Sequence, residues 1–185
     1  MLRRMVFALA LTFFCSAVLV PVQAQAAGKI GVANSLRISS QSAPGKEAEK
    51  QLQAMFGKER QELEKQGADL NKQAEDLRKQ AAALSEKARN ERAQKIQKQA
   101  QELDAKGTAY TQRLSRVQQA INAQMTDVLR EASNSFIKKN GYDMIIDATA
   151  VMAFVEGTDI TSGLIEEVNR VWKSKGGKFD LSSAK

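Results

Sequence analysis

Two carboxylates, Asp143 and Asp147, have the residue type and spacing that acid/base chemistry would need. In a strand, side chains four residues apart point to the same face, so these two would lie together. A working site needs further groups that converge on that place, and the chain offers no histidine, no glycine-rich phosphate loop and no nucleophile motif. We therefore interpret the pair as polar strand-end residues or caps. The sequence predicts a non-enzymatic protein without catalytic, cofactor-binding or metal-binding residues.

A second group of residues that could take part in chemistry consists of basic side chains in the middle of the chain, beside Glu86 and Glu91. Its members are Lys87, Arg89, Arg92, Lys95 and Lys98. Such a cluster could contact the phosphates of lipid A or an anionic membrane surface. The alternative is a solvated helical face that only keeps the protein soluble. We expect no nucleic-acid partner, because the stretch lacks the interleaved aromatic residues on which bases stack.

The first 26 residues have the layout of a secretory signal peptide. Arg3 and Arg4 precede an apolar stretch from Met5 to Val20, and small residues follow. The stretch is shorter than the roughly 20 residues that span a membrane, although an uncleaved N-terminal anchor stays as the alternative. Cleavage is expected after Ala26, or else after Ala24. The exported chain would then lack both cysteine and histidine, and loss of two arginines would lower the formal charge from +7 to +5, which suits acidic partners.

The sequence pattern of residues 46–139 predicts the overall architecture. No proline occurs after Pro44, and most residues are strong helix formers. Apolar residues recur at heptad spacing in a first series of Phe56, Leu63, Leu70, Leu77 and Leu84. A second series alternates steps of four and three through Ile96, Ala100, Leu103, Gly107, Tyr110, Leu114, Val117 and Ile121. Sustained patterning of this kind predicts a coiled coil.

The sizes of the apolar residues favour an antiparallel hairpin over a straight parallel coil, which is the alternative. Large residues occupy one core position in the first series and the other core position in the second. A turn near residues 88 and 89, made by 84–91, sets large against small side chains. The predicted pairs are Leu77 with Ala100, Leu70 with Gly107, Ala81 with Ile96, Ala74 with Leu103, Gly67 with Tyr110, Phe56 with Ile121, and Leu63 with Leu114. The predicted seam residues are Leu63, Leu70, Leu77, Ile96, Leu103 and Tyr110.

The flanking residues 27–45 and 140–173 predict a small body with strands at 29–33, 142–147 and 151–155. A last helix follows, with an apolar stripe of Leu164, Ile165, Val168, Val171 and Trp172. Residues 174–185, with Gly176 and Gly177, are predicted to be disordered. The predicted fold class is mainly α with a small β part, in which the helical hairpin is an insertion. Because so small a body buries little surface and leaves open sheet edges, we expect a homo-oligomer that closes its strands into a barrel.

Several short motifs resemble those of one family. They are Gly28–Asn34, Gly141–Ala148, Ala150–Ala153 and Asp159–Thr161, and by layout the likeness extends over nearly the whole exported chain. They resemble the Skp (OmpH-like) periplasmic chaperones. The resemblance implies a homotrimer whose three helical arms enclose a cavity, which holds unfolded outer-membrane β-barrel proteins without ATP. It also implies contact with lipopolysaccharide through basic residues on the arms. A structural or adaptor coiled coil of the cell envelope is the alternative function.

Overall fold

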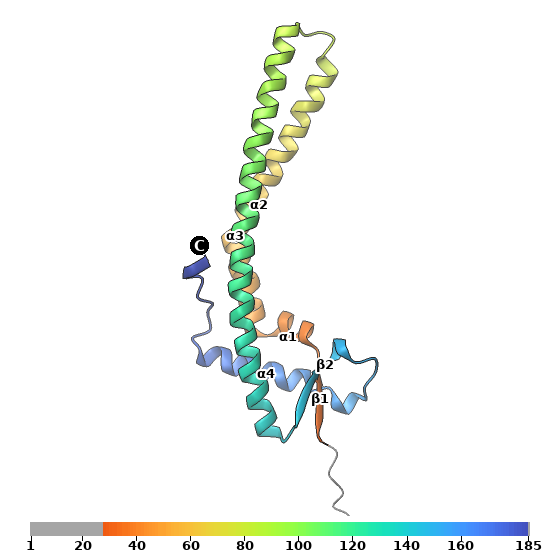
Figure 1. Ribbon diagram of the computed structural model, residues 1–185, viewed down its shortest axis with the longest axis vertical. Coiled ribbons are helices and arrows are strands. Elements are labelled where there is room, and N and C mark those ends of the chain that lie inside the picture. The colour runs from red at the N-terminus through yellow and green to blue at the C-terminus, as the bar shows by residue number, and fades with distance from the viewer. Residues whose placement is uncertain (1–27, 185) are drawn as a thin grey trace, which may run out of the picture.

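The computed structural model describes residues 28–184, so the predicted signal peptide with Cys15 lies outside the described residues. Two long helices form an arm that rises from a base of two short strands and two shorter helices (Figure 1). The fold is mainly helical with a small strand part, as predicted. Within residues 28–184, no helix has both the length and the apolar character needed to cross a membrane.

The arm helices begin and end at residues that satisfy free backbone groups. Helix α2 (Ala43–Gln80) starts after Ser42, whose hydroxyl oxygen accepts from the Gly45 N–H at 3.3 Å, and Pro44 lies in its first turn. Helix α3 (Glu86–Asn140) ends at Gly141, which adopts φ 65°. Glycine is favoured there because a left-handed residue strains other side chains. A serine before a helix, a proline in its first turn and a glycine after its last residue are usual signals of helix ends.

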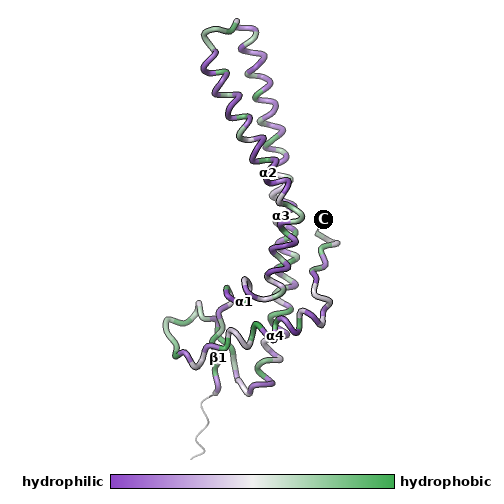
Figure 2. Tube along the Cα trace, turned by 180° about the vertical axis from the view of Figure 1, so that it is seen from behind, coloured by the Kyte–Doolittle hydropathy of each residue, from purple (hydrophilic) through white to green (hydrophobic). Residues whose placement is uncertain are grey.

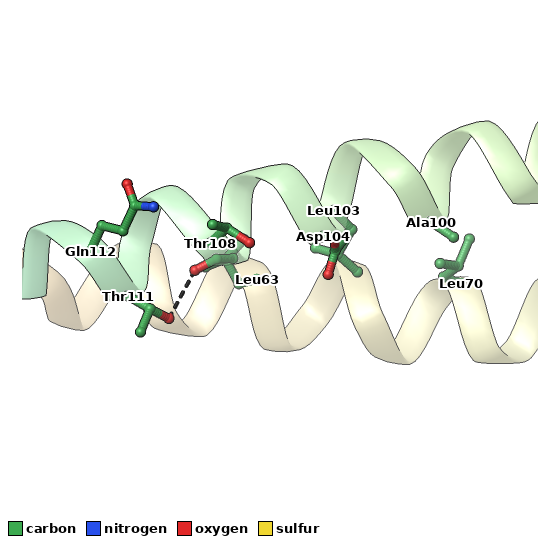
Figure 3. A pocket seen from close by; sticks show the side chains of 9 residues that line it. Leu63, Leu70, Ala100, Leu103, Asp104, Thr108, Thr111 and Gln112 are labelled. Carbon is green, nitrogen blue, oxygen red and sulfur yellow. Dashed lines mark hydrogen bonds between the residues drawn. The ribbon is translucent and has the colours of Figure 1, made fainter.

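The turn between α2 and α3 comprises Ala81–Ser85, so the predicted turn near residues 88 and 89 is wrong. The reason is local: the Ser85 side chain accepts from the Ala88 N–H at 3.2 Å and starts α3 at Glu86. All the predicted cross-arm pairs shift with the turn. Leu70 faces Ala100 instead of Gly107 (Figure 3), and a methyl group placed on Gly67 would lie 3.9 Å from Leu103 Cδ2, so Gly67 faces Leu103 instead of Tyr110.

The shift amounts to seven residues, which is one heptad, and it corrects the other predicted pairs as well. The pairs that are wrong are Leu77 with Ala100, Leu70 with Gly107, Ala81 with Ile96, Ala74 with Leu103, Gly67 with Tyr110, Phe56 with Ile121, and Leu63 with Leu114. Since a full heptad returns each helix to the same face, large residues still lie against small ones.

Strands β1 (Ile30–Ala33) and β2 (Met144–Asp147) form a parallel pair, with Ile30 opposite Met144. Parallel strands need a long crossover, and the whole arm serves as that connection. The predicted third strand at 151–155 is not formed; the segment is irregular between the 3₁₀ turns η1 (Ala148–Ala150) and η2 (Glu156–Thr158). Beyond β2, β1 is joined in the described chain only by an isolated bridge from Val32 to Asp159, and residues 151–155 pair with neither strand.

The core lies where α4 (Thr161–Ser174) crosses the lower part of α3. Helix α4 buries Leu164, Val168, Val171 and Trp172 of its predicted stripe, whereas Ile165 is half-buried. The facing residues of α3 are Val117, Ile121, Val128 and Ala132. Helix α1 (Ser35–Gln41) covers another side and is capped by Asn34, which accepts from the Arg37 N–H at 2.9 Å. The lower arm is therefore part of the body, without a structural break at residue 46 or 139.

The C-terminal residues pack against the arm, so the predicted disorder of 174–185 is wrong for residues 174–184. Gly176 and Gly177 have φ values of 94° and 66° and close α4. The Gly177 N–H donates to the Trp172 carbonyl at 3.0 Å and the Gly176 N–H to the Lys173 carbonyl at 3.1 Å, which is a Schellman cap. The chain then turns up along α3 (Figure 1). Phe179, Leu181 and Ala184 are buried there. The segment has few apolar residues, but these three make its apolar contacts with the rest of the fold.

Candidate functional site

The seam between α2 and α3 is the first candidate site, because it is open along its outer half. The six predicted seam residues are all half-buried. Leu63, Leu70 and Leu103 line an open groove of about 710 Å³, together with Ala100 and Gly107 (Figure 3). The groove also presents polar groups of Asp104, Thr108, Thr111 and Gln112. A surface of this kind offers scattered apolar contacts without a pocket of fixed shape.

Closer to the turn, Leu77 and Ile96 line a second groove with Arg92 and Lys95. Towards the base the residues of the seam become more buried, beside a groove of about 520 Å³ that Phe56, Tyr110 and Leu114 line. The ring of Tyr110 packs on Phe56, which is 6% exposed, and Val117 is 1% exposed. Hydrophobic colour is accordingly scattered along the outer arm and denser near α4 (Figure 2). The arm is thus loosely packed towards its turn and tightly packed at its base.

Polar contacts across the arm are exposed and add little stability. The Arg113 guanidinium pairs with the Glu59 carboxylate, and Lys106 Nζ donates to Gln66 Oε1 at 3.2 Å. Near the turn, Arg92 Nη1 donates to Gln80 Oε1 at 2.8 Å. Exposed ion pairs contribute about 0–1 kcal/mol each. These contacts cross the arm in the observed register, but each of them adds little to its stability.

The five basic residues proposed for anionic contact lie in the first turns of α3, next to the turn of the arm. Their side chains are exposed. Within residues 28–184, none of the five forms an ion pair with a carboxylate: Lys87, Arg89, Arg92, Lys95 and Lys98. The end of the arm therefore presents several cations that no internal acid neutralises. The aromatic rings that base stacking would need are absent from this stretch of sequence.

Asp143 and Asp147, which the sequence predicts to be polar strand-end residues or caps, both hold backbone in place. Asp143 Oδ2 accepts from the Lys29 N–H at 2.6 Å, which ties β2 to the start of β1. Asp147 Oδ1 accepts from the N–H and the hydroxyl of Thr149, at 2.8 and 2.9 Å. Hydrogen bonds from Ser35 and Thr149 lower the pKa of Asp147. Among the described residues, no group of three acidic side chains lies close enough to hold a metal ion.

A buried carboxylate that the sequence did not single out holds α4 to α3. Glu167 Oε1 accepts from Arg170 Nη2 at 2.6 Å and from Lys139 Nζ at 2.9 Å. Its side chain is 9% exposed. The Arg170 guanidinium, helped by Ser135 and Lys139, holds the pKa of Glu167 well below its usual range although burial opposes this. Arg170 could have been found from its spacing of three residues, whereas Lys139 is brought there only by the fold.

The second candidate site is an exposed apolar segment between β2 and α4. Met152 is fully exposed, and Val155 and Phe154 are exposed by 72% and 43%. The hydrophobic colour of this segment is plain beside β1 (Figure 2). Exposed apolar runs of this kind mark surfaces that bind another protein. The residues that predicted a third strand, 151–155, thus form an exposed segment that is not paired with a strand in the single chain.

Comparison with known proteins finds a family whose model matches this chain and several relatives of similar sequence. The family model described as outer membrane protein (OmpH-like) matches residues 29–168. The chain is 28% identical over 147 residues to the chaperone protein Skp of Photorhabdus laumondii, covering 80% of this chain and 89% of that protein. It is also 28% identical over 142 residues to the chaperone protein Skp of Yersinia enterocolitica, covering 77% and 87%.

A solved structure shares the fold. It is a putative outer membrane chaperone (OmpH-like) from Caulobacter crescentus, which matches with a TM-score of 0.58 and 19% identity. The match covers 78% of this chain and 86% of that chain.

Proposed function

The chain belongs to the OmpH-like family of outer membrane proteins, and on this premise we propose that it is a periplasmic chaperone. It holds unfolded outer-membrane β-barrel proteins without ATP and keeps them from aggregating. The named relatives, which are called chaperone protein Skp, support this proposal. Export through the predicted signal peptide would bring the chain to the compartment that such clients cross.

The observation that carries the proposal is the graded packing of the arm. At the base, Val117 and Phe56 are buried, whereas the seam residues beyond them are half-buried around an open groove. Many weak apolar contacts in one enclosure raise the effective concentration of a client, so avidity takes the place of sequence specificity. A loosely packed arm can adapt to clients of different size, as local stability follows the density of buried contacts.

An enclosure requires several arms, and the exposed segment 151–155 supports assembly into a homo-oligomer. In this proposal Met152, Phe154 and Val155 become covered when strands of neighbouring subunits join, as a trimer whose body is closed like a barrel. Closure would satisfy the open edges of the two-stranded sheet, which are otherwise a liability. It would also enlarge a body that is small for independent stability.

The cations next to the arm turn support contact with anionic groups. We infer that Lys87, Arg89, Arg92, Lys95 and Lys98 attract lipopolysaccharide phosphates or an anionic membrane surface. An excess of positive charge also draws acidic clients in faster, with rates that fall as salt increases. No step requires a cofactor.

The function is tested by diluting a urea-denatured outer-membrane β-barrel protein into buffer with the purified protein and measuring light scattering. The expected result is suppressed aggregation at near-stoichiometric ratio, with no effect of added ATP. A soluble protein of similar net charge serves as the control. The absence of suppression at every ratio, together with one dominant partner in a pull-down, would overturn the proposal and favour a structural or adaptor coiled coil.

A further inference from the structure

The C-terminal residues lie on α3 in the manner of a bound peptide. From Lys178 to Ser182 burial alternates: Phe179 and Leu181 are 6% and 7% exposed, while the residues between and beside them are exposed. A period of two is the pattern of an extended chain that faces a surface on one side. Residues 178–182 are called the tail strand below.

One side chain of α3 recognises the backbone of the tail strand. Gln124 Nε2 donates to the Asp180 carbonyl oxygen at 2.6 Å, and the Asp180 N–H donates to Gln124 Oε1 at 2.9 Å. The two bonds satisfy both backbone groups of one residue, as a neighbouring strand would. Bonds to the backbone do not depend on which side chain a residue carries. Specificity therefore comes from the side chains of the residues before and after it, which point to the same face.

Those alternate side chains enter apolar surroundings. The Phe179 ring lies 4.6 Å from the Trp172 ring between centroids, and Leu181 joins the same buried cluster. At the start of the tail, Lys175 Nζ pairs with Glu131 Oε2 at 2.8 Å. The contacts therefore select an extended segment with apolar residues at positions one before and one after the residue held by Gln124.

The tail strand is joined to the fold by a glycine turn. Gly176 and Gly177 complete the cap of α4, so the helix ends properly whether or not the residues after them are docked. The match to the family model ends at residue 168, before this segment begins. The tail strand thus lies outside the matched residues and occupies α3 as an intramolecular ligand.

We propose that the face of α3 around Gln124 is a docking site for an extended polypeptide segment with apolar side chains at alternate positions, and that the tail strand is its internal competitor. This inference rests on the proposed function. Strands of membrane β-barrels alternate apolar and polar residues, so unfolded barrel proteins supply many such segments. A client segment takes the place of residues 178–182 on Gln124.

The test uses full-length variants. Phe179→Asp/Leu181→Asp removes both apolar anchors and vacates the site. Gln124→Glu in that background keeps an acceptor for a backbone N–H but loses the donor and repels the carbonyl oxygen. Gln119→Glu is the matched control, since Gln119 lies on the same helix and, within residues 28–184, its side chain bonds only to Ser115, at 3.3 Å.

The probe is a fluorescein-labelled peptide of residues 175–185, read by anisotropy. It is expected to bind the vacated variant and to bind the intact protein much more weakly. Gln124→Glu weakens binding about fivefold or more, as loss of one hydrogen bond of about 1 kcal/mol implies, while Gln119→Glu has no effect. A peptide with residues 180 and 181 exchanged, which places Phe and Leu side by side and removes the alternation, binds poorly. A urea-denatured outer-membrane β-barrel protein displaces the native-sequence peptide.

A second measurement covers the case in which the vacated variant fails to fold. In the otherwise intact protein, Gln124→Glu frees Phe179 from Trp172, the single tryptophan, so its fluorescence shifts. Gln119→Glu leaves the fluorescence unchanged. Equal behaviour of the two variants in both assays would overturn the docking site.

The inference and the proposed function can fail separately. If the peptide binds but the denatured barrel protein does not displace it, while aggregation is still suppressed, the surface only seats the tail strand and the inference is wrong. If the intact protein suppresses no aggregation, the proposed function is wrong, whatever the peptide does.

Discussion

The rings of Phe56 and Tyr110 form a T-shaped pair across the arm, with centroids 5.7 Å apart and planes at 88°. The pair marks the level at which the arm closes. On its basal side Val117 and Ile121 are buried, and on its outer side Leu63 and Leu103 are half-buried. The two helices are therefore joined firmly below this contact and loosely above it.

The first prediction concerns this gradient of stability. Phe56→Ala should lower the free energy of unfolding by about 3–5 kcal/mol, as for a buried aromatic residue. Leu70→Ala, in the half-buried seam, should cost only about 1–2 kcal/mol because less apolar area is lost. Urea unfolding followed by circular dichroism measures both. Met55→Ala, at an exposed neighbouring position, is the control and should change stability little. A larger loss at Leu70 than at Phe56 would contradict the gradient.

The second prediction concerns the register of the arm. Cysteines at positions 70 and 100, in a protein without Cys15, should be joined within one chain by a short bismaleimide. Leu70 faces Ala100, so the two thiols lie close together. The control pair, at 77 and 100, should react poorly, since it belongs to the register one heptad away. Mass spectrometry of the digested protein identifies the products, and preferred crosslinking of 77 to 100 would refute the register.

The heptad pattern explains which features of the arm could be predicted from the sequence and which could not. The size pattern of Leu70, Gly67 and Leu103 required antiparallel helices with large against small residues, and the structure has that arrangement. A shift by one heptad preserves the same pattern, so size alone could not choose between registers. The choice depends on the hydroxyl of Ser85, a local cap that starts α3 at Glu86.

The base shows a different limit. Residues 151–155 have strand-like composition, but a strand forms only when it is paired, and in the single chain this segment pairs with neither β1 nor β2. The tail strand looked polar and glycine-rich because its few apolar residues, Phe179 and Leu181, matter through their alternation and through the face of α3 that receives them. That face is assembled by the fold and cannot be identified from local sequence.

The third prediction concerns acid. The pKa of Glu167 is lowered in the folded protein, so the stability from its ion cluster is present above the unfolded pKa of about 4.5 and is lost as the pH falls below it. Thermal unfolding between pH 7 and pH 3 should show this loss. Glu167→Gln should cost about 1–3 kcal/mol at pH 7 and flatten the decline. Glu166→Gln, at the exposed neighbour, is the control; if both variants decline alike, the cluster does not supply the acid dependence.

The fourth prediction concerns assembly. Met152→Asp/Val155→Asp should shift the protein from the proposed trimer towards monomers in sedimentation velocity, because burying two carboxylates at a subunit contact is costly. Met55→Asp places one such charge on the arm and should leave the oligomer intact. If the double variant sediments as the unmodified protein does, the segment 151–155 is not the assembly surface.

Site-specific photo-crosslinking tests most directly whether the client is held between the arms. A benzoylphenylalanine is placed at Thr108, which lines the seam groove, or at Lys138, an exposed residue at the base of α3. A urea-denatured outer-membrane β-barrel protein is diluted into each variant and irradiated. Strong client crosslinking from position 108 and little from position 138 is the predicted result. Crosslinking from position 138 alone, or from neither position while aggregation is still suppressed, would contradict the account.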